Sequence, residues 1–175
     1  MRSAARGRKT QEARTPLALY TREERERRDR SGWTIVQGIL APVQFLIFAV
    51  SLVLVTRYLV TGAGIFAANA SVVAKTIALY AIMVTGALWE HDVFGKYLFA
   101  PAFFWEDIVS MAVIALHTAY LITLVFGLLT PAERFTIALA AYASYAINAT
   151  QFVLKLRAAR RQMQSGAALG GEVAA

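Results

Sequence analysis

Four ionisable side chains near the middle of the sequence are of the types that carry acid–base chemistry. Glu90 ends one apolar run, Glu106 and Asp107 begin the next, and His117 follows on the same run. On a helix, His117 would lie about 16 Å from Glu106 along the axis at 1.5 Å per residue. A carboxyl group at the mouth of an apolar bundle has few structural uses. We therefore take these residues as candidate catalytic groups.

Uncharged polar residues continue from these groups along three apolar runs at helical spacing. Polar side chains are costly inside a bilayer, so a stripe of them at about 100° per residue marks the side of a helix that faces inward. The three stripes point to one cavity, although hydrogen bonding between helices is the other explanation for each amide and hydroxyl. They are Gln37, Gln44, Ser51 and Tyr58; Glu106, Ser110, His117 and Tyr120; and Ser144, Asn148, Gln151 and Lys155.

The segment from Trp89 to Trp105 is crowded with aromatic rings. It holds seven of them, whereas aromatic residues make up 11% of the chain. A belt of rings at the membrane interface accounts for part of this excess. Gly95 and Pro101, in a connection of about 18 residues, indicate a folded or re-entrant lid. Rings bounded by carboxylates suit a large, flat, apolar ligand. The candidate binding residues are Ser110, Gln37, Gln44, Asn148, Gln151, Trp105, Phe104 and Tyr120.

The elements that must position these groups are membrane helices. The chain has 175 residues, of which 58% are hydrophobic, and a mean hydropathy of +0.51. Uncharged runs cover residues 31–56, 76–89, 108–132 and 135–154, and a helix needs about 20 residues to cross a bilayer. We predict an all-α membrane protein with a bundle of four transmembrane helices. The second span reaches this length only if it begins near Ala70 and carries Lys75 close to its end, where the ammonium can reach the interface.

The predicted organisation is one membrane domain between two tails. We expect a disordered basic tail over residues 1–18, a four-helix domain over residues 19–160, and a disordered tail over residues 161–175. Thr21-Arg-Glu-Glu24 is typical of a capping box and predicts a short juxtamembrane helix over residues 22–30. The spans are expected at 34–59, with a kink at Pro42, and at 70–89, 104–126 and 132–156.

Charge indicates how the chain lies in the membrane. The net charge is +7, and its excess flanks the first and last apolar runs, which is the usual signal for cytoplasmic ends. We therefore expect both termini in the cytoplasm and contact with membrane lipid rather than nucleic acid. The chain has no cysteine and two histidines, which excludes thiolate catalysis, iron–sulfur clusters and zinc–thiolate sites. No cofactor of its own is expected.

Several segments closely resemble the 3-vinyl bacteriochlorophyllide hydratase family. The most specific is Phe-Ala-Pro-Ala-Phe-Phe-Trp-Glu-Asp at 99–107. The resemblance covers about residues 19–160. The other segments are Leu-Tyr-Thr-Arg-Glu-Glu-Arg at 19–25, Trp-Thr-Ile-Val-Gln-Gly-Ile-Leu-Ala-Pro-Val-Gln-Phe at 33–45, Ile-Met-Val-Thr-Gly-Ala-Leu-Trp-Glu at 82–90 and Leu-His-Thr-Ala-Tyr at 116–120.

The resemblance implies a multi-pass enzyme of a phototrophic bacterium, in its cytoplasmic or intracytoplasmic membrane. It implies addition of water to the 3-vinyl group of a chlorophyllide or bacteriochlorophyllide, a flat macrocycle that brings its own Mg and a propionate. It also implies contact with other enzymes of bacteriochlorophyll synthesis.

On this chemistry Glu106 is the candidate acid, and Glu90 or Asp107 the base or the stabiliser of the cation. His117 is either a proton relay or an axial ligand to the substrate Mg. Lys96, Lys155 or Arg157 could receive the propionate, and the exposed His91 and Asp92 are weaker candidates. The alternative function is a chlorin-binding or photosynthetic assembly protein without catalysis.

Overall fold

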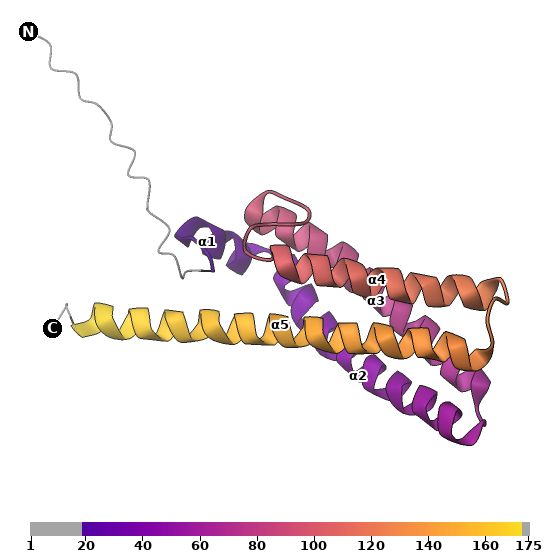
Figure 1. Ribbon diagram of the computed structural model, residues 1–175. Coiled ribbons are helices and arrows are strands. Elements are labelled where there is room, and N and C mark those ends of the chain that lie inside the picture. Colours follow the sequence, from indigo (N-terminus) through magenta and orange to yellow (C-terminus); the bar gives the residue numbers. More distant parts are fainter. Residues whose placement is uncertain (1–18, 173–175) are drawn as a thin grey trace, which may run out of the picture.

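The computed structural model describes the chain from residue 19 to residue 172, and side chains up to residue 161. This part of the chain is helical, with short turns and loops between the helices (Figure 1). The predicted basic tail over residues 1–18 lies outside the described residues. The helices are α1 (Arg22–Arg30), α2 (Gly32–Thr61), α3 (Ile65–Phe94), α4 (Phe104–Val125) and α5 (Pro131–Glu172).

Four of these helices are long and apolar enough to cross a membrane. They are α2, α3, α4 and the Pro131–Arg161 part of α5, which are 22 to 31 residues long. A span of about 20 residues is sufficient to cross the hydrocarbon core. The prediction of an all-α bundle with four apolar spans is therefore confirmed. Pro42 lies inside α2, and the helix continues through it.

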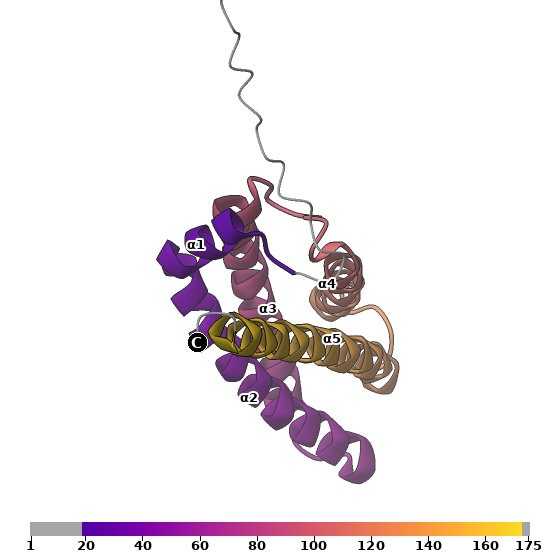
Figure 2. The ribbon, with the colours of Figure 1, turned by 90° about the vertical axis from the view of Figure 1, so that its left-hand side faces the viewer.

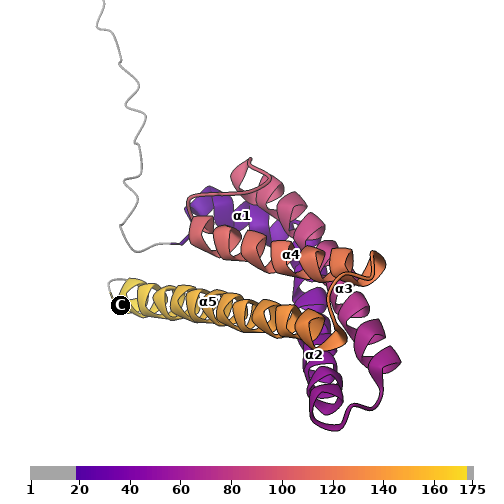
Figure 3. The same cartoon turned by 45° about the vertical axis from the view of Figure 1, so that its right-hand side comes forward.

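The four long helices form two hairpins. A short turn joins α2 to α3, and Gly62 in it ends α2 with a φ of 70° in the left-handed region, where glycine has no steric penalty. Gly127, with a φ of 64°, lies in the connection between α4 and α5. The hairpins pack mainly within themselves and cross each other at an angle (Figure 3). Viewed from the loop end, α5 lies between α2 and α4 (Figure 2).

The two ends of the bundle differ. At the loop end lie α1, the loop between α3 and α4, and the C-terminal half of α5 (Figure 1). At the turn end lie the two short connections within the hairpins. Tyr20, Val93 and Phe103 form the buried core at the loop end, while Val55 and Phe135 belong to a larger cluster toward the turn end.

The predicted juxtamembrane helix and its capping box are confirmed. α1 covers Arg22–Arg30, and the Thr21 hydroxyl accepts a hydrogen bond from the backbone N–H of Glu24 at 3.2 Å. The Glu24 carboxylate in turn accepts from the backbone N–H of Thr21 at 2.7 Å. These two bonds satisfy donors that the start of a helix would leave free.

The prediction for the second span was wrong about its start and about Lys75. α3 begins at Ile65 rather than near Ala70, because Gly64 completes the turn and residues 65–69 contain no helix breaker. Lys75 is therefore well inside the helix and fully buried. It does not extend to the interface, because the Tyr145 ring of α5 receives its ammonium, with Nζ 3.5 Å from the ring centroid.

The connection between α3 and α4 is shorter than predicted. Helix α3 continues to Phe94 and α4 starts at Phe104, so nine residues, 95–103, form the loop. Gly95 ends α3 with a φ of 73°, in the conformation that favours glycine. At the other end of the domain, the α5 backbone stays helical to Glu172, beyond the predicted end of the last span near Leu156. The predicted division into domain and tails otherwise stays a prediction.

Candidate active site

The loop end gathers three carboxyl groups from two helices. Glu90 lies in the last turns of α3, and Glu106 and Asp107 lie in the first turn of α4. All three are buried. Carboxylates in the first turn of a helix interact favourably with the helix dipole, but a buried carboxyl group also needs specific partners. The structure therefore brings the three predicted acids together, and their partners define the site.

Glu106 has a cationic partner on the last helix. The Lys155 Nζ lies 2.6 Å from Glu106 Oε2, a short charge-assisted contact. The same ammonium lies 4.9 Å from the centroid of the Phe103 ring. Lys155 ends the stripe that the sequence predicts on α5, and it is thus part of the site. An ion pair leaves Glu106 as a carboxylate with no proton to donate.

Glu90 and Asp107 hold the loop between their helices. The backbone N–H of Phe99 donates to Asp107 Oδ2 at 2.7 Å, and that of Ala100 donates to Glu90 Oε2 at 3.2 Å. Phe99 has a φ of 60°, a left-handed conformation that costs a residue with a Cβ about 1–2 kcal/mol. The bond to Asp107 helps to offset this cost. The two acids thus have a structural role, which is to hold the loop against the bundle.

Glu90 and Asp107 also lie close together, because they accept from the backbone N–H groups of adjacent loop residues. Two buried carboxylates that share a site repel each other, so such a site favours a proton on one of them. Glu106, the residue before Asp107, is already paired with Lys155. The arrangement therefore places a pair of carboxyl groups beside one ion pair.

Aromatic rings of the segment from Trp89 to Trp105 pack together at the same end of the bundle. Trp89, Phe94 and Phe103 pack against one another with centroid separations of 5.5 to 5.9 Å. Two further members of this group were not predicted from the sequence. Tyr20 stacks on Phe94 at 5.8 Å, and Phe152 stacks on Phe103 at 5.8 Å. Phe152 could have been found, because it follows Asn148 by one helical turn on the α5 stripe.

Phe104 and Trp105 point away from this cluster. They are 44% and 69% exposed, so they face the surroundings of the bundle at the start of α4. This is the position of an interfacial aromatic belt. The structure does not place either ring beside the three acids.

Three of the predicted binding residues hydrogen-bond neighbouring helices. Gln37 donates to Thr85 Oγ1 at 2.7 Å and links α2 to α3. The Tyr120 hydroxyl donates to Asn69 Oδ1 at 2.7 Å, far from the acids and toward the turn end. Ser110 accepts from Asn148 Nδ2 at 2.8 Å and links α4 to α5. Helix packing accounts for these contacts.

Other polar atoms are buried without a hydrogen-bond partner among the described residues. A buried polar atom left unpaired costs about 1–3 kcal/mol, so each marks a place that a ligand or water can satisfy. His117 is fully buried; its Nδ1 lies 2.8 Å from the Val113 carbonyl oxygen. Nδ1 must carry the proton there, which leaves a lone pair on Nε2. The atoms concerned are His117 Nε2, Lys75 Nζ, Gln44 Nε2, Asn148 Oδ1, Gln151 Oε1 and Arg134 Nε.

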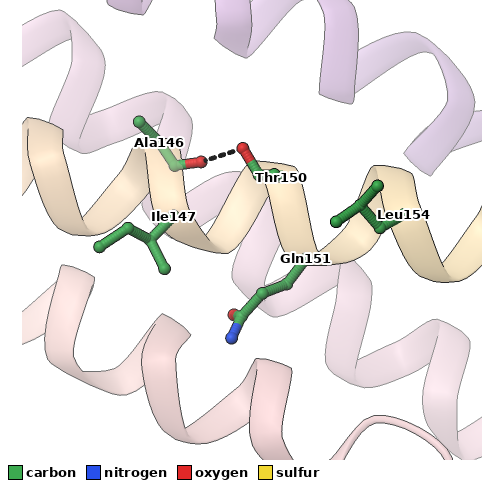
Figure 4. A pocket seen from close by; sticks show the side chains of 5 residues that line it. All are labelled: Ala146, Ile147, Thr150, Gln151 and Leu154. Carbon is green, nitrogen blue, oxygen red and sulfur yellow. Dashed lines mark hydrogen bonds between the residues drawn. The ribbon is translucent and has the colours of Figure 1, made fainter.

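A shallow depression of about 360 Å³ lies on α5 (Figure 4). Gln151 lines it together with Ile147 and Leu154, and Thr150 nearby donates to the Ala146 carbonyl oxygen at 2.8 Å. Its lining is mostly apolar, and it lies on the helix that supplies Asn148 and Lys155.

The remaining sequence candidates lie on the surface. Lys96 and Arg157 are exposed. His91 stacks on Tyr97 at 4.3 Å, and Asp92 accepts from the Ser31 hydroxyl at 2.8 Å. Over residues 19–161 no three histidine or carboxylate side chains are grouped to hold a metal ion.

The chain is similar to proteins of known name. A family model described as 2-vinyl bacteriochlorophyllide hydratase matches residues 20–158. A relative of that name from Rhodobacter capsulatus is 64% identical over 148 residues, covering 85% of this chain and 86% of the relative. Another, from Cereibacter sphaeroides, is 63% identical over 147 residues, covering 84% and 91%. No solved structure matches the chain.

Proposed function

This chain belongs to the 2-vinyl bacteriochlorophyllide hydratase family, and from that premise we propose how its geometry performs the hydration. The enzyme is a hydro-lyase of bacteriochlorophyll biosynthesis that adds water to the vinyl group of a chlorophyllide-type macrocycle. The matching family model names this group the 2-vinyl group, and the family to which the sequence segments are similar names it the 3-vinyl group. The observation that supports the proposed mechanism is the cluster of three buried carboxyl groups at one end of a membrane bundle.

The reaction requires one proton donor and one proton acceptor. A proton adds to the terminal carbon of the vinyl group, and positive charge develops on the carbon attached to the macrocycle. Water then bonds to that carbon and loses a proton, which leaves a 1-hydroxyethyl group. Each well-placed acid or base contributes about 10²–10⁴ in rate.

We assign the donor role to the pair of Glu90 and Asp107. Both are buried and accept from adjacent backbone N–H groups, and two buried carboxylates that share a site favour retention of one proton, so the pair would have a proton to give. Trp89 and Phe103 belong to the buried apolar cluster at the same end of the bundle, which would limit the access of water. This differs from the sequence-based choice of Glu106 as the acid, and the reason is the ion pair between Glu106 and Lys155.

Glu106 then suits the complementary role. As a carboxylate held by Lys155, it can stabilise the developing cation and accept the proton of the adding water. Glu106 then passes this proton to Asp107, the next residue in the first turn of α4, and so back to the donor pair. In this way the cluster is restored after each turnover with no external donor.

His117 suits the role of axial ligand to the substrate Mg better than that of proton relay. Its Nε2 is buried with a lone pair and has no partner among the described residues, and neutral imidazole is a common metal ligand. Its position, about 16 Å along the helix from Glu106, is too distant for direct proton transfer. The Mg is part of the substrate.

We further propose that the protein is a multi-pass protein of the bacterial inner membrane with both termini in the cytoplasm. The four apolar helices and the basic residues after the last span support this. The loop end would then face the cytoplasm, where other enzymes of the pathway can deliver the substrate. Contacts with lipid follow from the apolar side chains exposed along α2.

The direct test is hydration in labelled water. Membranes bearing this protein are incubated with the vinyl substrate in ¹⁸O-water, and the product is examined by mass spectrometry. The expected result is one ¹⁸O atom in a 1-hydroxyethyl product, formed only when the protein is present. Pigment binding without any labelled product would instead support the alternative of a chlorin-binding or assembly protein.

A further inference from the structure

Lys75 is a buried basic residue to which the proposed mechanism gives no task. It lies on α3, where its side chain faces the hairpin formed by α4 and α5, and it is fully buried. Its ammonium contacts the Tyr145 ring with 3.5 Å between Nζ and the ring centroid. Nζ has no hydrogen-bond partner among the described residues.

The position of Lys75 places it in the same part of the bundle as the proposed Mg ligand. Lys75 contacts the Tyr145 ring of α5, and the centroid of the His117 ring lies 5.9 Å from that of Tyr142, about one turn earlier on the same helix. His117 Nε2 is also buried and unpaired. Two neighbouring helices thus each direct an unsatisfied polar atom into the same part of the bundle, which indicates a ligand with groups for both.

A buried ammonium without an oxygen partner is costly to the folded protein. Contact with an aromatic face recovers only part of the hydration that the charge loses. A carboxylate is the group that complements an ammonium most completely, since it offers both opposite charge and hydrogen-bond acceptors. The substrate implied by the family is a free acid and carries one carboxylate.

The other basic residues near the site are less suitable for that carboxylate. Lys155 already pairs with Glu106 at 2.6 Å. Lys96 and Arg157 are exposed to the surroundings, where an ion pair is worth little.

We propose that Lys75 binds the free carboxylate of the macrocycle while His117 contacts its metal, so that the two residues fix the orientation of the ring. This inference rests on the proposed function. Lys75 is a binding and orienting residue in it and takes no part in proton transfer.

The test compares two forms of one vinyl macrocycle, the free acid and its methyl ester, by absorbance titration of the purified full-length protein. The wild-type protein should bind the acid about 30-fold or more tightly than the ester, since a buried charge pair is worth at least that ratio. In K75M the ratio should fall to about one, and K75R should keep a clear preference for the acid. K96M is the matched control and should keep the wild-type ratio.

Stability separates this role from a purely structural one. Because Lys75 lacks an oxygen partner in the ligand-free protein, K75M should unfold at the wild-type temperature or above it. A structural role in contact with Tyr145 would lower that temperature.

The results against the proposal are clear. An acid-to-ester ratio near one in the wild-type protein would overturn it even if K75M fails to fold, and so would an unchanged ratio in K75M or its loss in K96M. If the wild-type protein binds neither compound and forms no hydrated product, the proposed function fails instead.

Discussion

Lys155 Nζ of α5 lies 2.6 Å from Glu106 Oε2 of α4, so the last helix neutralises the first acid of the helix before it. This contact ties the packing of the second hairpin to the chemistry of the site. It also distinguishes Glu106 from Glu90 and Asp107, which accept hydrogen bonds from the backbone of the loop instead.

Replacement of Glu106 should reveal this pairing. E106Q removes the carboxylate and leaves Lys155 unpaired, which should cost about 1–3 kcal/mol of stability and lower hydration by about 10²-fold or more. Adding K155M should restore the thermal midpoint without restoring turnover. Both are measured on purified protein in detergent. Recovery of turnover in the double variant would show that Glu106 acts only through its ion pair.

Asp107 can be tested without release of the loop. D107N keeps a side-chain oxygen that can accept from Phe99 N–H, but it removes an ionisable member of the donor pair. Hydration should fall about 10²–10⁴-fold with pigment binding retained. D107A should also make the loop sensitive to protease, because the bond at 2.7 Å is lost. Turnover in D107N close to the wild-type value would exclude the proposed donor pair.

The strained backbone at Phe99 predicts a difference in stability between two small substitutions. Both F99A and F99G remove the ring, but only alanine keeps the Cβ that disfavours a φ of 60°. F99G should therefore be about 1–2 kcal/mol more stable than F99A, the reverse of the usual order. Thermal or chemical unfolding of the two variants measures the difference. Equal stabilities would mean that this conformation carries no cost.

The buried phenol of Tyr20 predicts that the folded protein loses stability at alkaline pH. Burial raises the pKa of its phenol from 10.0 to about 12, although Arg28 opposes the rise. The folded state therefore holds this proton more tightly than the unfolded chain. The contribution, up to about 3 kcal/mol, is complete below about pH 10 and disappears as the pH rises toward about 12. Y20F lacks this proton, so the difference in thermal midpoint between Y20F and wild type should change across this range only.

The topology can be tested with a reporter inserted in the loop between α3 and α4. A reporter after Lys96 should give a cytoplasmic signal, because Lys96 is exposed and this loop lies at the same end of the bundle as α1 and the C-terminal half of α5 (Figure 1). A periplasmic signal would reverse the proposed orientation.

Local patterns in the sequence predicted much of this architecture. Hydropathy indicated four spans, and the Thr21 capping box located α1 almost to the residue. The positions of Glu90, Glu106 and Asp107 at span ends predicted that the acids lie at one end of the bundle. Such features depend on neighbours in sequence, and the sequence contains them directly.

Features that depend on the register between helices could not be predicted in the same way. The partner of Lys155 depends on how far α5 is shifted along α4, and no local pattern encodes that shift. The burial of Lys75 depended on Gly64, which lets α3 start five residues before Ala70. Tyr20 precedes the first membrane span in sequence, and only tertiary packing places it on Phe94.

The backbone N–H groups of Phe99 and Ala100 donate to the two carboxyl groups proposed as the proton source. Movement of the loop away from the bundle would break both of these bonds together. On the proposed mechanism, the order of the loop and the order of the proton donor are therefore a single property of the enzyme.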